Sequence, residues 1–393
     1  MTTELSERTK KIEPSATLAV GALARELKSQ GRDIINLSQG EPDFATPDAI
    51  KEAAIQAIHD NFTKYTNVDG YVPLKEAIVN KFKRDNQLDY DLKEIVVSSG
   101  AKQSIYNCAL SVLNPGDEAI IPAPYWVSYP EIVKMAEGIP VEISAGIDQH
   151  FKITAQQLEA AITPKTRLFI INSPRNPTGM AYTAAELKAL ANVLLKHPKI
   201  IIMSDDIYEY ILWNGTFANL LNVCPELRNR TIIVNGASKA YAMTGWRIGY
   251  AAGPAEIIQA MKKIQSQSTG CPNSIAQVAT KTALEFDRSK YLYMVEAYQK
   301  RNALVIEKLK SMNGVSCIPS DGAFYSFIDV TKTMQRLKLS SDIELAKHIL
   351  NEANVAVVPG TPFGASGYIR ISYATSEEKL NKALERLAPI MVK

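Results

Sequence analysis

The residues with the clearest chemical potential lie between Ser238 and Tyr250. Lys239 comes shortly after an apolar run, Thr231–Val234, that is typical of a buried strand. A lysine among small residues at a strand exit is partly desolvated, which disfavours its ammonium form and leaves an amine able to attack a carbonyl. Eight residues later, Arg247 offers a planar fork for a phosphate or carboxylate. An amine beside an anion clamp suits a phosphorylated aldehyde cofactor.

Three further polar groups follow predicted strands, where open α/β sheets bind ligands. Residues 99–102 join a strand to a helix, so free backbone N–H groups and the helix dipole would face an anion there. Residues 176–179, with the sequence Asn-Pro-Thr-Gly, form either a plain turn or a binding loop. Asp205 or Asp206, at the end of the next strand, would place a carboxylate there that could pair with a cationic N–H group.

The segment around Lys239 closely resembles the cofactor-lysine motif of class I/II aminotransferases, which are fold-type-I pyridoxal-phosphate enzymes. The resemblance runs from Pro14–Thr17 to Ile369–Ser376 and is closest to aspartate aminotransferases of the bacterial and plant subgroup. It implies an α/β fold, with a mainly parallel seven-stranded sheet between helices and a smaller α+β domain. The large domain would span residues 48–295, and the small domain residues 1–47 and 296–393. Pyridoxal 5'-phosphate would be the cofactor, in a homodimer with shared active sites.

The same resemblance implies which residues hold the cofactor. Lys239 would bind the aldehyde through its amine and move the proton during catalysis. Asp205 is favoured over Asp206 for the ring nitrogen because the family's aspartate lies three residues before a tyrosine, here Tyr208. The implied cofactor contacts are Gly100, Ala101, Lys102, Trp126, Asn176, Asp205, Tyr208, Ser238, Lys239 and Arg247, with Tyr65 reaching the phosphate of the neighbouring subunit.

The implied substrate contacts are Gly40, Trp126, Asn176 and Arg370. Arg370 matches the arginine that grips the substrate α-carboxylate, and a buried arginine without an anion would be costly. Trp126 matches an aromatic residue that stacks on the pyridine ring, although a buried tryptophan is more often plain core.

Three positions bear on substrate choice or depart from the family pattern. Lys102 falls where the subgroup places a cation near the distal carboxylate of aspartate, with Ser15 and Thr17 on the same side, or it is an ordinary helix lysine. Arg175 replaces the usual small or polar residue, and either contacts the distal carboxylate or faces solvent. Gly236 stands where some relatives have a serine, so one phosphate contact would be missing.

The implied activity is a ping-pong transfer of the amino group between L-aspartate, or a related amino acid, and 2-oxoglutarate. The alternatives are another fold-type-I enzyme: an aromatic, prephenate or broad-specificity aminotransferase, or a carbon–sulfur β-lyase. A nicotinamide enzyme is disfavoured because no Gly-x-Gly-x-x-Gly follows a strand. A non-catalytic regulator of this family would need a DNA-binding extension that we do not expect here.

Composition favours a cytoplasmic protein and gives no indication of nucleic-acid binding. Among 393 residues, 44 lysines and arginines nearly balance 41 aspartates and glutamates, so no broad basic surface for nucleic acid is expected. The four cysteines are scattered, which gives no pattern for disulfides or metal and suggests a reducing compartment. The N-terminus is polar and no apolar stretch reaches membrane-spanning length.

Apolar runs and helical patterns alternate through the centre, which predicts a mainly parallel sheet covered by helices on both faces. The expected strands are 94–98, 118–121, 167–172, 200–204, 231–235 and 248–252, with helices at 102–113 and 187–195. Beyond residue 253 we expect helices at 255–267, 274–285 and 291–312, and then short strands at 323–329, 355–358 and 368–372.

Overall fold

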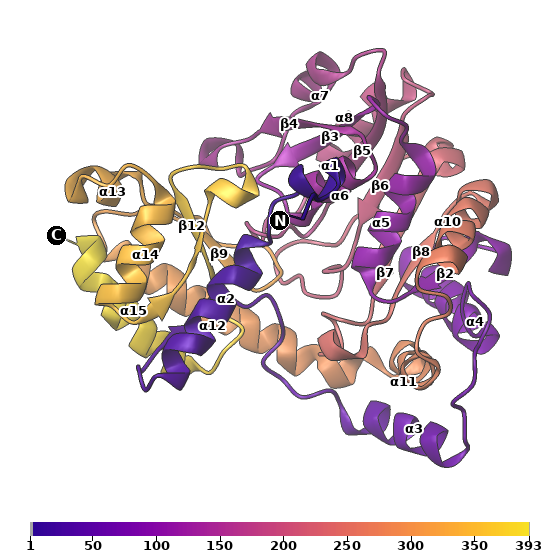
Figure 1. The fold of residues 1–393 in the computed structure, drawn as a ribbon, viewed down its shortest axis with the longest axis horizontal. Coiled ribbons are helices and arrows are strands. Elements are labelled where there is room, and N and C mark those ends of the chain that lie inside the picture. The colour runs from indigo at the N-terminus through magenta and orange to yellow at the C-terminus, as the bar shows by residue number, and fades with distance from the viewer. Residues whose placement is uncertain (1–2, 393) are drawn as a thin grey trace.

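A computed structural model describes residues 3–392, and its centre is a seven-stranded sheet in the order β2-β8-β7-β6-β5-β3-β4 (Figure 1). Only β8 runs against the other strands. This confirms the predicted fold class. The strands are β2 (Ile95–Ser98), β3 (Glu118–Ala123), β4 (Ile139–Ser144), β5 (Thr166–Asn172), β6 (Ile201–Asp205), β7 (Thr231–Gly236) and β8 (Gly249–Ala252).

Helices cover both faces of this sheet because its inner strands are apolar on both sides. Successive side chains of a strand point to opposite faces, so Ile120 packs into the core on one side while Ala119 and Ile121 pack on the other. The helices of the second face are α5 (Ala101–Val112), α6 (Ser128–Met135) and α10 (Ala255–Ser268). The first face is covered by α4 (Val72–Lys81), α8 (Ala184–Leu195), α9 (Leu220–Val223) and α11 (Ser274–Glu285), together with α3 (Asp48–His59) and α7 (Ala155–Ala161).

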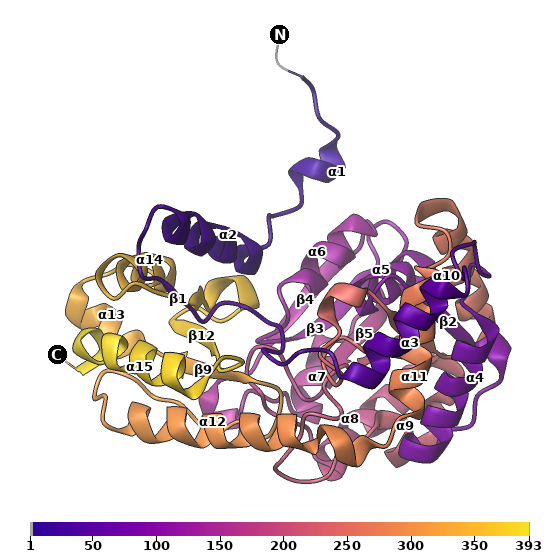
Figure 2. The same ribbon diagram turned by 90° about the horizontal axis from the view of Figure 1, so that it is seen from below.

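A smaller α+β unit stands beside the large sheet (Figure 2). Its antiparallel sheet has the order β11-β12-β9, formed by β9 (Tyr325–Asp329), β11 (Val358–Pro359) and β12 (Tyr368–Ser372). A parallel pair joins β1 (Ile35–Asn36) to β10 (Val355–Ala356), so residues near the two ends of the chain share this unit. Its helices are α2 (Ala16–Ser29), α12 (Leu292–Lys310), α13 (Thr331–Leu337), α14 (Asp342–Glu352) and α15 (Glu377–Val392).

Two features differ from the sequence predictions. The edge strand β4 was not predicted; most of its residues are only partly buried or exposed, which leaves no continuous apolar run. The single strand predicted at 355–358 is wrong: it divides at Val357, because β10 pairs with β1 whereas β11 pairs with β12. Predicted helix ends otherwise agree with the structure to within three residues, the largest difference being the start of α8.

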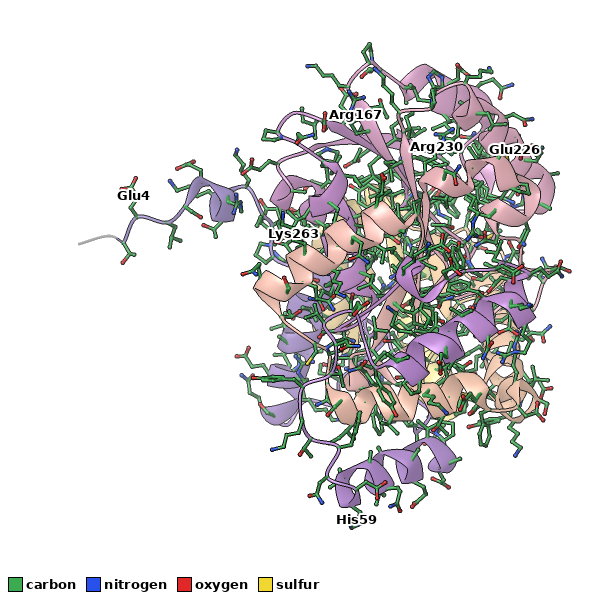
Figure 3. The ribbon with its side chains drawn as sticks, turned by 90° about the vertical axis from the view of Figure 1, so that its right-hand side faces the viewer. Glu4, His59, Arg167, Glu226, Arg230 and Lys263 are labelled. Carbon is green, nitrogen blue, oxygen red and sulfur yellow. The ribbon has the colours of Figure 1, made fainter. Side chains whose placement is uncertain are left out.

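The N-terminal segment, with the short helix α1 (Glu7–Lys10), projects from the body of the chain, and Figure 3 shows Glu4 on this projection. His59, at the end of α3, lies at another edge of the molecule. Between residues 3 and 392, no helix has both the length and the apolar character required to cross a membrane.

Candidate active site

A cavity of about 430 Å³ opens where the carboxyl ends of β5, β6 and β7 face the start of α5 and the smaller sheet. This is where an open α/β sheet binds its ligand. The cavity brings together most of the residues singled out from the sequence. Its lining includes Ser15, Thr17, Gly40, Ala101, Lys102, Trp126, Asn176, Asp205, Tyr208, Ser238, Lys239, Arg247 and Arg370.

Lys239 lies on the loop that follows β7, and its Nζ donates a hydrogen bond to the Gly40 carbonyl at 2.5 Å. Burial is the main reason that its pKa falls to about 8, and the nearby cations Arg247 and Arg370 lower it further against the opposing charge of Glu41. A lysine with this pKa has more free amine near neutral pH than an ordinary surface lysine, as its sequence context predicted.

The start of α5 and Arg247 together form an anion site. Gly100 has φ +88, and a Cβ there would overlap the Arg247 guanidinium. Gly249 lies against the same turn, where a Cβ would overlap the backbone nitrogen of Ala101. The only hydrogen bond that Arg247 makes within the described residues goes to the Thr244 carbonyl. The guanidinium and the free N–H groups of the helix are therefore available to a phosphate.

Asp205 ends β6 and is 4% exposed. Burial raises its pKa to about 6, against hydrogen bonds from the Tyr129 hydroxyl at 2.5 Å and the Ile207 N–H at 3.2 Å. The carboxylate lines the cavity and has no cation bonded to it among residues 3–392. It is therefore suited to a ligand N–H that carries positive charge.

Arg370 is 1% exposed on β12 and also lacks a carboxylate partner in the part of the chain described. Its guanidinium donates to Asn176 Oδ1 at 2.9 Å and to the Ser38 carbonyl at 2.6 Å, and it lies 4.5 Å from the centre of the Tyr325 ring. Burial lowers its pKa, and its Nε has no partner within residues 3–392. Such a buried, incompletely bonded guanidinium is suited to an anionic ligand.

Two tyrosines in or beside the cavity were not predicted. The Tyr325 and Tyr208 hydroxyls share a hydrogen bond of 2.8 Å, and Tyr129 bonds Asp205. Tyr325 lies within a predicted strand and Tyr129 in a segment with no predicted element, so neither carries a local signal of its own. Only the packing of distant segments brings their hydroxyls to this place.

Lys102 lies at the cavity with its Nζ 4.9 Å from the centre of the Trp126 ring. Desolvation, and then the charge of Arg247, lower the pKa of Lys102. Ser15 and Thr17 line the same cavity. The structure thus brings a cation and two hydroxyls to one cavity, a placement that the first of the two interpretations of Lys102 requires.

Both alternatives considered for Arg175 are wrong. The side chain is buried, and its guanidinium bonds the carbonyls of Phe151, Pro122 and Pro124, the last two at 2.8 and 2.6 Å. Buried backbone carbonyls require donors, and the arginine turns away from the cavity to supply them. Arg175 therefore neither faces solvent nor reaches the cavity.

Packing explains why position 236 is a glycine. A Cβ at Gly236 would lie 2.9 Å from the Ile248 carbonyl, so the close pairing of β7 with β8 favours glycine over serine here.

Tyr65 lies outside the cavity and is 97% exposed. Within one chain, therefore, Tyr65 does not contribute to the site.

Comparison with known proteins gives a consistent result. The sequence pattern of the family "Aminotransferase class I and II" matches residues 32–387. An "Aspartate/prephenate aminotransferase" of Nitrosomonas europaea is 54% identical over 99% of this chain and 100% of that protein. An "Aspartate aminotransferase" of Rhizobium meliloti is 48% identical over 98% of this chain and 95% of its own length.

Solved structures agree. The aspartate aminotransferase of Rhizobium meliloti superimposes with a TM-score of 0.94 at 46% identity, covering 99% of each chain. The aspartate aminotransferase of Thermus thermophilus with maleate has a TM-score of 0.94 at 43% identity, covering 99% of this chain and 100% of that one.

Proposed function

The chain belongs to the class I and II aminotransferases, pyridoxal-phosphate enzymes, and from that premise we propose that it transfers the amino group of L-aspartate to 2-oxoglutarate by a ping-pong mechanism. The observation that carries the proposal is a single cavity holding a lysine of lowered pKa, a buried aspartate and an arginine with a free Nε. Prephenate is a second candidate for the amino acceptor, because the relative from Nitrosomonas europaea is named for both substrates.

The residues present fit pyridoxal 5'-phosphate. Gly100, Ala101, Ser238 and Arg247 would hold its phosphate, and the absence of a side chain at Gly100 leaves Arg247 room beside the helix start. Asp205 would accept a hydrogen bond from the protonated ring nitrogen, and Trp126, Asn176 and Tyr208 would contact the ring or its oxygen. When bound, the cofactor supplies an electron-poor ring that stabilises negative charge on the carbon that loses its proton.

The chain's own residues would bind the amino acid and move its proton. The Arg370 guanidinium would bind the α-carboxylate through two parallel hydrogen bonds. Asn176, which accepts a hydrogen bond from that guanidinium, would fix its orientation. Lys239 Nζ, as a free amine, takes the proton from the Cα of the amino donor. In the second half of the ping-pong cycle it delivers a proton to the Cα of the amino acid that is formed from the 2-oxo acid. Tyr208, held by Tyr325, keeps its hydroxyl aimed into the cavity.

We also propose that Lys102 binds the distal carboxylate of aspartate, with Ser15 and Thr17 beside it. Support comes from its place on the cavity wall, at the Trp126 ring, together with these two hydroxyl residues. A dicarboxylic substrate would then meet a cation at each end, Arg370 and Lys102. A monocarboxylic amino acid would leave the second cation without an anion, which favours aspartate.

The remaining proposals concern the whole chain. We propose a homodimer in which Tyr65 reaches the phosphate of the neighbouring site; the apolar side chains of Ile55 and Ile58 on α3 are also exposed. We propose a large cofactor-binding domain at 48–295 and a small domain formed by 1–47 and 296–393. A cytoplasmic location is supported by four free cysteines.

The direct test is to assay the purified protein with 2-oxoglutarate and a panel of amino donors. We expect kcat/KM for aspartate to exceed that for leucine or phenylalanine by at least about tenfold, roughly 1.4 kcal/mol of binding at one charged contact. The variant Lys239→Ala should lose the visible absorbance of the bound cofactor and more than about 10³-fold of kcat. Equal turnover of leucine would contradict the substrate assignment, and substantial turnover by Lys239→Ala would contradict the role of the lysine.

A further inference from the structure

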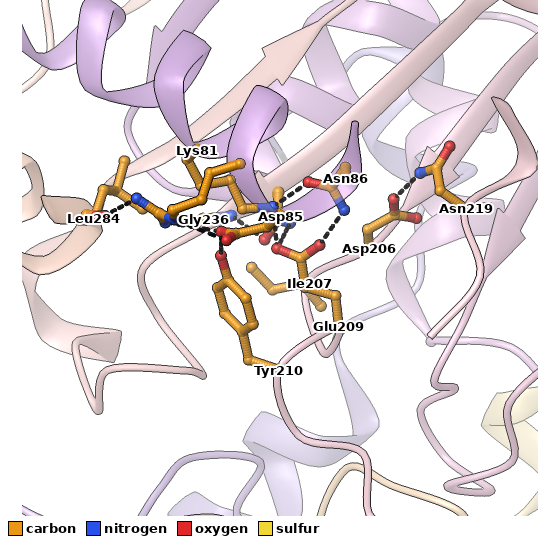
Figure 4. Close-up of polar contacts among 12 residues, drawn as sticks. Lys81, Asp85, Asn86, Asp206, Ile207, Glu209, Tyr210, Asn219, Gly236 and Leu284 are labelled. Atoms are coloured by element: carbon orange, nitrogen blue, oxygen red, sulfur yellow. Dashed lines mark hydrogen bonds and ion pairs between the residues drawn. The ribbon is translucent and has the colours of Figure 1, made fainter. Parts of the chain in front are cut away.

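The turn that follows β6 has two different faces. Asp205 and Tyr208 line the cavity, whereas Glu209 points to the other side, into a buried polar cluster beneath α4 (Figure 4). The Glu209 N–H donates to the Asp206 carbonyl at 2.9 Å, which closes the turn. The position of the two cavity residues is therefore tied to the position of Glu209.

Glu209 connects this turn to two other parts of the fold. Its Oε1 pairs with Lys81 Nζ at the end of α4 and accepts a hydrogen bond from Asn235 Nδ2 at 2.9 Å. Its Oε2 accepts from Asn86 Nδ2 at 2.9 Å, and Lys81 Nζ also donates to Asn86 Oδ1 at 2.6 Å. Asn235 belongs to β7 and lies four residues before Lys239. Glu209 thus joins the turn after β6 to the segment that carries the lysine.

This connection continues where the backbone pairing stops. The last paired residues of the β6–β7 ladder are Asp205 and Val234, and one further backbone hydrogen bond runs from the Asp206 N–H to the Val234 carbonyl at 2.9 Å. Beyond that point β7 continues as the partner of β8 alone. Within the described residues, the Glu209–Asn235 bond is the only side-chain hydrogen bond between segments 206–211 and 235–241. Ile207 also packs beside Gly236, and the Tyr210 ring centre lies 6.1 Å from that of Tyr241.

Fold stability does not account for the charges in this cluster. Lys81 is 0% exposed and Glu209 is 4% exposed. Taking both charges out of water offsets most of their attraction, so well-packed neutral side chains would stabilise the fold at least as well. A charged pair, however, fixes direction and distance more strictly than apolar contacts do.

We propose that Glu209, held by Lys81 and bonded to Asn235, is a positioning residue that sets the turn carrying Asp205 and Tyr208 against the loop carrying Lys239. This inference rests on the proposed function, since the groups it aligns are those expected to hold the cofactor ring and to move the proton. A shift of either loop would misalign the lysine amine relative to the ring without removing any group that touches it.

Two double variants distinguish the effect of the Glu209–Asn235 hydrogen bond from that of the buried Lys81–Glu209 ion pair. Lys81→Met with Glu209→Gln removes both charges of the pair and keeps an oxygen that accepts from Asn235. Its amide N–H can donate to Asn86 Oδ1 once the Asn86 amide turns over. Lys81→Met with Glu209→Leu is equally uncharged but has no bond to Asn235. We expect the Gln variant to keep kcat for aspartate within about threefold of wild type, and the Leu variant to lose at least about tenfold in kcat with less than about threefold change in KM.

Amide hydrogen exchange of the full chain without cofactor gives a readout independent of catalysis. Segments 205–211 and 235–241 should exchange at least about tenfold faster in the Leu variant than in the Gln variant. Asn235→Ala, which keeps the Lys81–Glu209 pair, should accelerate exchange in the same two segments and decides the matter if the Leu variant does not fold. The control is Lys152→Met with Glu186→Leu, an ion pair of 2.7 Å outside the cavity lining, which should change neither exchange there nor kcat.

The inference would be overturned if the Leu variant and Asn235→Ala both kept the wild-type amide exchange rates in these two segments and the wild-type kcat for aspartate. A wild-type protein that binds no cofactor and turns over no aspartate would instead overturn the proposed function, while the exchange experiment would still decide whether Glu209 holds the two segments together.

Discussion

At the scale of single residues, the side chains expected to bind ligands or move protons are those whose charged form the fold destabilises. Asp205 and Arg370 are buried and Lys239 is half-buried, and none of them has an opposite charge bonded to it in the described chain. The pKa values of all three shift toward the neutral form. Burial of this kind lowers the stability of the cofactor-free protein and is offset when anionic and cationic ligand groups arrive.

Asp205 permits a test of this trade-off. Its pKa rises from 3.8 to about 6 on folding, so the native state binds more protons between these values and stability falls as pH rises through that window. We expect cofactor-free Asp205→Asn to be more stable than wild type by roughly 1–2 kcal/mol at pH 8, less than the full shift implies because the amide offers one oxygen to two donors.

Urea unfolding at pH 4, 6 and 8 measures this difference, which should shrink toward zero at pH 4. The same variant with cofactor should lose at least about 100-fold in kcat. A stability difference that is the same at all three pH values would show that ionisation of Asp205 is not its source.

At the scale of elements, the site depends on how closely β8 approaches α5. Gly249 in β8 lies against the Ala101 nitrogen, and Gly236 in β7 lies against the Ile248 carbonyl. The strands of the large sheet that were predicted from continuous apolar runs were confirmed, because burial on both faces leaves a strong signal. The exposed edge strand β4 lacked that signal, and nothing local distinguishes the glycines that permit close approach.

Gly249→Ala tests this approach. The added methyl overlaps the first turn of α5, so we expect that turn to move, affinity for pyridoxal phosphate to fall at least about tenfold, and the cofactor-free protein to lose about 1–3 kcal/mol. Gly146→Ala is the matched control: Gly146 has φ −82 and no atom within 4 Å of a new Cβ, so its effect should stay within about 0.5 kcal/mol. Equal effects of the two substitutions, measured by fluorescence titration and urea unfolding, would contradict the packing argument.

At the scale of the whole molecule, one predicted residue would reach a site only in the dimer that we propose. Tyr65 is almost fully exposed, whereas the other predicted residues line the cavity or, for Gly100, adjoin Arg247. The shared site that we propose would reconcile these facts, because a tyrosine on the surface of one subunit would then be part of its neighbour's phosphate site.

Mixed dimers of Lys239→Ala and Tyr65→Phe chains test the sharing. If Tyr65 acts on the neighbouring site, the mixed dimer contains one site with both Lys239 and Tyr65, and should show wild-type cofactor affinity there and about half of wild-type turnover per dimer. If Tyr65 acts within its own chain, the only site with a lysine carries the Tyr65→Phe substitution, and its affinity should match that of the Tyr65→Phe homodimer. Purification through two different tags, followed by cofactor titration, distinguishes the outcomes.

The sequence by itself determined the alternation of apolar strands with helices, the lysine and arginine after β7, and the polar groups at strand ends, because these depend on neighbouring residues and short-range periodicity. Only the tertiary structure decided where long side chains point. It turned Arg175 toward carbonyls at the end of β3, brought the Tyr129 and Tyr325 hydroxyls to Asp205 and Tyr208, and placed Glu209 between α4 and β7. Their partners are distant in the chain, and the cost of an unpaired buried polar group chooses among them only once the elements are packed.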